Sequence, residues 1–141
     1  MKTQLTIKQI MMILLCAGLT ILPAQGLNAE SKIPKMVLNQ AVISESIKNF
    51  QPVNLAAIFS ISLEEVFCFS NFDPVRVKTH IFHKWFKHDK LIFTMRLTLT
   101  PPRWSSFSKI QLRDEDKGPW RVEIRDDGDK ILQTLRFSIS D

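Results

Sequence analysis

The sequence predicts an all-β fold: an immunoglobulin-like β-sandwich of about seven antiparallel strands, preceded by an N-terminal signal peptide helix. Short runs of β-branched and aromatic residues recur at roughly 8–12-residue spacing, and clusters of Pro, Gly and Asp separate them. No long segment of the mature chain has the 3.6-residue period of a helix. The chain has 141 residues, 45% of them hydrophobic, which is about the length of one domain.

The first 29 residues have the layout of a secretory signal peptide. Lys2 and Lys8 precede an uncharged apolar run at residues 10–22, after which small and polar residues follow. Cleavage fits after Ala29, which we favour, or after Gly26. The apolar run is short for a bilayer span, which needs about 20 residues, so an uncleaved anchor is the less favoured alternative. We therefore expect an exported protein, periplasmic or extracellular.

Removal of this segment changes the charge and the cysteine content. The whole chain has 19 basic and 14 acidic residues and a net charge of +5, which falls to +3 when Lys2 and Lys8 leave. Cys16 leaves as well, so Cys68 stands alone and the mature domain cannot form an internal disulfide. Export excludes nucleic acid as a partner. Membrane contact is expected only through the N-terminal segment, if it stays uncleaved.

The mature chain divides into an exposed lead, residues 30–35, and a β-domain, residues 36–141. Residues 36–44 are apolar and β-branched enough for a first strand. Residues 53–62 are ambiguous between a short helical turn and an extended loop, because period alone cannot resolve short apolar runs. Residues 65–72 resemble a strand that is buried on both faces.

A long extended segment follows at residues 74–86, and residues 87–90 form a turn. Strand alternation places six residues of this segment on one face: Val75, Val77, Thr79, Ile81, His83 and Trp85. The return strand, residues 91–99, has a strict period of two, with one buried and one wetter face. Pro101 and Pro102 end it.

Three more strands complete the predicted sandwich. Residues 105–112 form one, and residues 120–125 alternate Trp, Val and Ile with charged side chains. Asp127-Gly128 is typical of a type I′ hairpin turn, which requires positive φ angles. The last strand places Leu, Phe and Ile inward at residues 135–139.

Several ordered motifs resemble the bacterial family known as domain of unknown function 2914 (DUF2914). They are an opening segment at residues 47–53, an aromatic strand at residues 66–70, and the family-motif residues His83, Trp85, Arg103, Trp104, Ser108, Lys109, Gly118, Trp120 and Gly128. The resemblance spans about residues 37–139. Two positions depart from the family pattern: Ser105 replaces a basic residue and Gln51 replaces an acid. The resemblance implies export or a membrane segment, and no established reaction.

The sequence contains no convergent catalytic or metal-binding set. On a strand His80 and His83 point to opposite faces, and His88 lies in a turn, whereas zinc needs three or four converging ligands. His83 is expected to be buried and hydrogen-bonded beside Trp85. Cys68 lies between two phenylalanines, where burial would raise its pKa, so we expect a core residue and not a nucleophile. The protein is therefore not expected to be an enzyme, and no cofactor is expected.

The candidate ligand-binding residues are Arg103, Trp104 and Lys109, with Ser105 and Ser108 completing a polar rim. Trp85 and Trp120 are expected to be core anchors. Two functions follow as hypotheses. The first is a non-catalytic envelope module that binds another protein or supports assembly. The second is a carbohydrate- or cell-wall-binding module that uses Trp104 and its polar neighbours.

Overall fold

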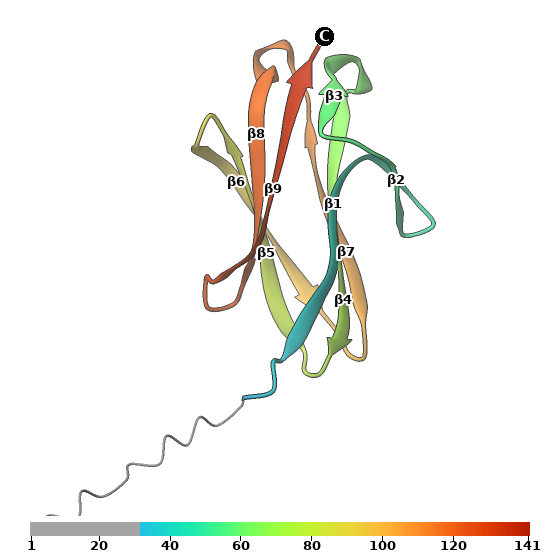
Figure 1. The fold of residues 1–141 in the computed structure, drawn as a ribbon, viewed down its shortest axis with the longest axis vertical. Coiled ribbons are helices and arrows are strands. Elements are labelled where there is room, and N and C mark those ends of the chain that lie inside the picture. Colours follow the sequence, from blue (N-terminus) through green and yellow to red (C-terminus); the bar gives the residue numbers. More distant parts are fainter. Residues whose placement is uncertain (1–31) are drawn as a thin grey trace, which may run out of the picture. The chain divides into compact units, whose positions relative to one another are not determined.

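The computed structural model describes residues 32–141; the predicted signal peptide lies outside the described residues. Two sheets pack face to face and confirm the all-β sandwich (Figure 1). Sheet A has the strand order β2-β1-β4-β7, and sheet B has the order β3-β9-β8-β5-β6. The strands are β1 (Met36–Lys48), β2 (Gln51–Leu55), β3 (Ile58–Ser60), β4 (Glu65–Val75), β5 (Thr79–Lys87), β6 (Lys90–Leu99), β7 (Trp104–Gln111), β8 (Gly118–Asp126) and β9 (Ile131–Ser140).

The strand order is immunoglobulin-like. The order β9-β8-β5-β6 corresponds to the GFC sheet extended by strand C′, and β1-β4-β7 corresponds to strands A, B and E. The described residues form nine strands, where about seven were expected. The two additional strands, β2 and β3, are short, and β3 pairs with β9 in parallel, whereas the other pairs are antiparallel. Two short 3-10 turns, η1 (Ile61–Leu63) and η2 (Asp114–Asp116), complete the described elements, and none of these forms a helix long and apolar enough to cross a bilayer.

The core lies between the two sheets and is rich in aromatic rings. Trp85 of β5 is fully buried, stacks on Phe93 at 5.8 Å between ring centroids, and meets the edge of Phe137 at 6.1 Å. Trp120 of β8 is 5% exposed and stacks on the other side of this cluster against Phe137. The expectation that both tryptophans are core anchors is confirmed.

Residues 74–86 belong to two strands in different sheets and not to one extended segment. β4 ends at Val75 in sheet A, and β5 begins at Thr79 in sheet B. Val77 lies in the connection and is 47% exposed, although alternation placed it on the buried face. The other five residues of that predicted face are buried. The crossover was missed because apolar and β-branched residues continue through it without Gly, Asn or Asp.

The type I′ turn also lies elsewhere than expected. In the loop between β5 and β6, His88 and Asp89 have φ angles of 45° and 63°, which is the pattern of that turn. In the loop after β8 the positive φ, 65°, belongs to Asp129 and not to Gly128. There the Asp126 carboxylate accepts hydrogen bonds from the backbone N–H groups of Gly128 and Lys130, each at 2.9 Å, and closes a longer loop.

Candidate functional site

A hydrogen-bonded cluster of polar side chains connects the two sheets inside the core. His83 of β5 is fully buried, and its two ring nitrogens contact hydroxyls of the opposite sheet: Nε2 lies 3.0 Å from Ser70 Oγ, and Nδ1 lies 2.8 Å from Ser108 Oγ. The Trp85 indole Nε1–H donates to the same Ser108 oxygen at 3.0 Å. The expectation that His83 is buried and hydrogen-bonded beside Trp85 is confirmed.

The cluster suits a neutral imidazole, and burial disfavours the charged one. Because Trp85 already donates to Ser108 Oγ, the Ser108 hydroxyl can donate its own proton to Nδ1, and Nε2–H can then donate to Ser70. A protonated ring would have N–H groups on both nitrogens and a charge in the core without a carboxylate in this network. Burial accordingly lowers the pKa of His83 to about 3.

Cys68 occupies the strand that carries the first cysteine of an immunoglobulin disulfide. It is fully buried on β4, and burial raises the pKa of its thiol, as expected for a core residue. The inward residues of β8, where the second cysteine would lie, are Trp120, Val122 and Ile124. Within residues 32–141 the two sheets are therefore connected by the polar cluster around His83 and not by a disulfide.

The histidines lie in different surroundings. His80 Nδ1 pairs with Thr98 Oγ1 at 3.2 Å on the outer side of sheet B, and His88 lies in the turn between β5 and β6. Within residues 32–141 no three His, Cys, Asp or Glu side chains are grouped to hold a metal ion.

The structure separates the candidate ligand-binding residues. Trp104 is the first residue of β7 and is 41% exposed, with Arg103 exposed beside it. Lys109 lies five residues further along β7, roughly 17 Å away at about 3.4 Å per residue, with odd spacing that puts it on the opposite face. Ser108 points into the core and cannot belong to a rim, while Ser105 accepts a hydrogen bond from Asn71 at 2.9 Å.

Lys109 instead lines a cleft between the edge strands of the two sheets. The cleft has a volume of about 320 Å³, and Phe93, Ile110 and Trp120 contribute apolar surface to it. Its remaining lining residues are Ile92, Gln111, Arg113 and Asp116. Asp116 pairs with Lys87 at 3.4 Å, and its carbonyl accepts the Trp120 Nε1–H at 2.7 Å, so these contacts hold one wall of the cleft in place.

The outer face of sheet A carries an aromatic surface that the sequence analysis missed. Because Cys68 faces the core, Phe67 and Phe69 point outward, where Phe107 of β7 joins them. Phe107 is 42% exposed and lies 6.1 Å from Phe67 between ring centroids. Phe69 is only 1% exposed although it is not part of the core between the sheets. We call Phe67, Phe69 and Phe107, with the flanking Val42 and Leu55, the outer aromatic face.

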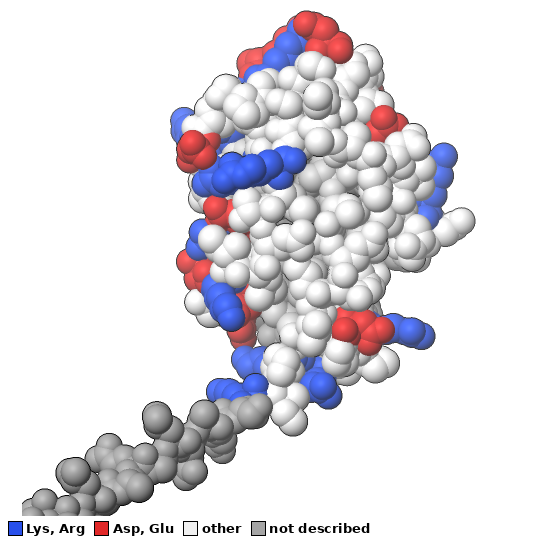
Figure 2. All heavy atoms as spheres, in the orientation of Figure 1, with Lys and Arg blue, Asp and Glu red and all other residues white. Residues whose placement is uncertain are grey.

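The outer face of sheet B is dominated by charged side chains. In Figure 2, Lys, Arg, Asp and Glu gather mainly along the side of the molecule formed by this sheet. At its centre Glu123 accepts from Arg121 Nε at 3.1 Å and from Arg125 Nε at 2.9 Å. Although burial opposes it, these hydrogen bonds hold the pKa of Glu123 below its usual range. Arg125 also pairs with Asp129 at 2.8 Å, so the ion-pair network extends from β8 to the loop that follows it.

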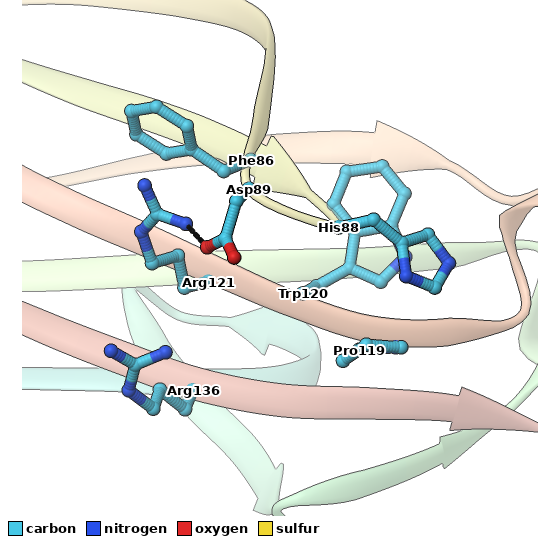
Figure 3. A pocket seen from close by; sticks show the side chains of 7 residues that line it. All are labelled: Phe86, His88, Asp89, Pro119, Trp120, Arg121 and Arg136. Atoms are coloured by element: carbon cyan, nitrogen blue, oxygen red, sulfur yellow. Dashed lines mark hydrogen bonds and ion pairs between the residues drawn. The ribbon is translucent and has the colours of Figure 1, made fainter.

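A small pocket opens beside this network at the turn between β5 and β6 (Figure 3). It has a volume of about 120 Å³ and is lined by Phe86, His88, Asp89, Pro119, Trp120, Arg121 and Arg136. Gly118, a family-motif residue, has a φ of 113°, and a Cβ at this position would lie 3.0 Å from the His88 ring. Glycine is therefore needed both for the backbone angle and for the approach of His88.

Fold and buried cluster together define the class of protein: a two-sheet all-β domain with immunoglobulin-like strand order. The family model described as "Protein of unknown function (DUF2914)" matches residues 78–139, which confirms the resemblance over this stretch. The matched residues include all nine family-motif positions, whereas the motifs at residues 47–53 and 66–70 precede them. Among curated proteins no match was found.

Proposed function

We propose that this domain is a non-catalytic binding module of the cell envelope that docks a partner protein on the outer aromatic face. The observation that carries the proposal is the 42% exposure of Phe107 beside Phe67 on the outer face of sheet A. The solvent-facing side of an antiparallel sheet is ordinarily polar. Aromatic residues are enriched at protein interfaces, where they supply much of the binding energy.

The rows of the sheet bring these side chains together. Val42, Phe69 and Phe107 are register partners across β1, β4 and β7, so their side chains form one row. Phe67 lies in the adjacent row, between Ser44 and Lys109, and the Lys109 ammonium lies 5.8 Å from its ring centroid. A partner with apolar side chains and a hydrogen-bonding rim complements this arrangement.

The hairpin beside the face supports the same proposal. Figure 1 shows the hairpin that β1 and β2 form. Phe50 lies between these two strands, has a φ of 57° and is 74% exposed. A bulky residue with positive φ is an outlier that costs free energy. An exposed aromatic ring in this strained position supports a role for Phe50 as a contact that a partner would cover.

Photo-crosslinking in the exporting cell tests the proposal. A photoreactive amino acid at position 107 is expected to give a discrete adduct with one envelope protein, identified by mass spectrometry. Phe67→Ser should reduce that adduct at least fivefold because it removes the neighbouring ring. The same preparation reports the mature N-terminus, expected at Glu30, or at Leu27 for the other cleavage point.

The matched control is position 131. Ile131 is 46% exposed, close to the 42% of Phe107, but begins β9 in the other sheet. Equal adducts from positions 107 and 131, or none from position 107, would contradict docking on the outer aromatic face. A folded Phe67→Ser variant, verified by circular dichroism, excludes unfolding as the cause of a lost adduct.

The exposure of Trp104 supports a second candidate function, the binding of a carbohydrate or cell-wall fragment. An exposed indole beside Arg103 could stack on a sugar ring while the guanidinium donates hydrogen bonds. Titration with peptidoglycan fragments should then change the tryptophan fluorescence, and Trp104→Phe should abolish most of this change. No change across a panel of glycans removes this candidate, because Trp85 and Trp120 are too buried to report contact.

A further inference from the structure

Arg121 and Arg136 form a like-charged pair directly across two neighbouring strands. They are register partners in β8 and β9, and Figure 3 shows both side chains extending in the same direction. Directly opposed like charges destabilise a sheet unless something neutralises them. Arg121 is neutralised by Glu123 and by Asp89. Arg136 is exposed and has no ion pair with any residue of the described part of the chain.

The surroundings of Arg121 orient its guanidinium for anion recognition. Its Cζ lies 4.0 Å from the centroid of the Phe86 ring, so the aromatic surface supports one face of the planar group. Glu123 binds the Nε atom, and Asp89 binds at Nη1. The Nη edge is therefore the part of Arg121 left for a ligand, and a planar oxyanion can accept two parallel N–H bonds there.

Asp89 shows which chemistry fits at this edge. Its carboxylate pairs with Arg121 from the two-residue turn, yet its side chain is 87% exposed and is held by no other described partner. An ion pair so exposed contributes little to stability, so an incoming carboxylate could displace it at low cost. The turn residue therefore acts as an internal substitute for a ligand.

We propose that the pocket at the turn between β5 and β6 binds a carboxylate group, held between the guanidinium groups of Arg121 and Arg136, with Asp89 as the group that it displaces. The pocket volume of about 120 Å³ suits a single small anionic group. Phe86 and Trp120 supply apolar walls that would contact the carbon attached to the carboxylate. The site lies on sheet B and is independent of the partner surface proposed on sheet A.

Nuclear magnetic resonance titration of the folded domain tests this site. Sodium acetate is the probe, sodium phosphate is the tetrahedral comparison, and sodium chloride holds the ionic strength constant. Acetate should produce saturable shifts at Arg136 and Asp89. Arg136→Gln should raise the Kd for acetate at least fivefold, and Asp89→Asn should lower it at least twofold because the internal competitor is gone.

Arg96 offers a matched control for charge. It lies on β6 opposite Phe82 of β5, is exposed on the same outer face, and forms no ion pair within residues 32–141. Arg96→Gln removes the same charge and should change the Kd less than twofold. The proposal is overturned if Arg96→Gln and Arg136→Gln weaken binding equally, if acetate shifts do not saturate, or if phosphate binds more tightly than acetate.

Discussion

Lowering the pH from 7.5 to 4.5 is expected to reduce the free energy of unfolding by about 2–3 kcal/mol through His83 alone. In the folded domain burial lowers the pKa of this ring to about 3, against 6.5 in the unfolded chain. Between these two values the unfolded state binds a proton that the folded state does not. Stability from this group is fully present above pH 6.5 and is lost as the pH falls toward 3, at up to about 1.4 kcal/mol per pH unit.

Urea denaturation at several pH values measures this loss. Carboxylates also contribute to the loss of stability in acid, because hydrogen bonds from Lys35 and Lys84 hold the pKa values of Asp127 and Asp129 below their usual range. The His83→Gln variant isolates the histidine contribution, since it keeps hydrogen-bonding groups and cannot titrate. Its stability should depend less on pH between 6.5 and 4.5, although it is lower at neutral pH. The control variant is His88→Gln, at an exposed position, whose stability should depend on pH as in the parent. If the stability of His83→Gln also depended on pH as in the parent, the buried ring would not be responsible.

Replacing Trp85 with alanine is expected to lower the free energy of unfolding by about 3–5 kcal/mol. The side chain is fully buried, contacts Phe93 and Phe137, and donates the hydrogen bond that Ser108 accepts. Its removal leaves a cavity at the centre of the sandwich and alters the network around His83. Chemical denaturation followed by circular dichroism measures the change.

Two further variants test the reason for this loss, one by keeping a ring at position 85 and one by removing an exposed tryptophan. Trp85→Phe keeps a ring but removes the Nε1–H, so it should cost about 1–2 kcal/mol and remain measurable if the alanine variant does not fold. Trp104→Ala should cost no more than about 1–2 kcal/mol, because this indole is 41% exposed at a strand end. Equal losses for Trp104→Ala and Trp85→Ala would mean that Trp104 is also a core anchor.

The strands with regular alternation could be predicted from the sequence. In β8 the buried Trp120, Val122 and Ile124 alternate with charged residues, and in β9 Phe137 and Ile139 are buried as expected. Alternation alone did not predict the burial of β6, an edge strand in which Leu91 and Met95 are 47% and 40% exposed. A register shift against β5 places Leu91 opposite Phe86, so that the strict alternation is interrupted there. Local pattern therefore identified the strands but not their place in the sheet.

The candidate sites depend on contacts between distant residues, which local pattern does not contain. The Arg121–Arg136 pair arises from the register of β8 against β9, and the outer aromatic face from β4 lying between β1 and β7. One signal was available in the sequence. Phe67 and Phe69 flank Cys68, so a strand with Cys68 in the core must place both rings outward. The expectation of a strand buried on both faces holds at Phe69, which is 1% exposed on the outer side, but it did not foresee the exposed Phe107 beside Phe67.

The connection of the sheets through His83 has a consequence for how the domain matures. Comparable sandwiches join strands B and F by oxidation of two thiols, whereas here His83 on strand C joins the other sheet by hydrogen bonds with Ser70 on strand B and Ser108 on strand E. No oxidant, thiol exchange or disulfide isomerase takes part in forming this crossing. The connection between the sheets within residues 33–141 therefore does not depend on thiol oxidation, and a reducing agent is expected to leave it intact.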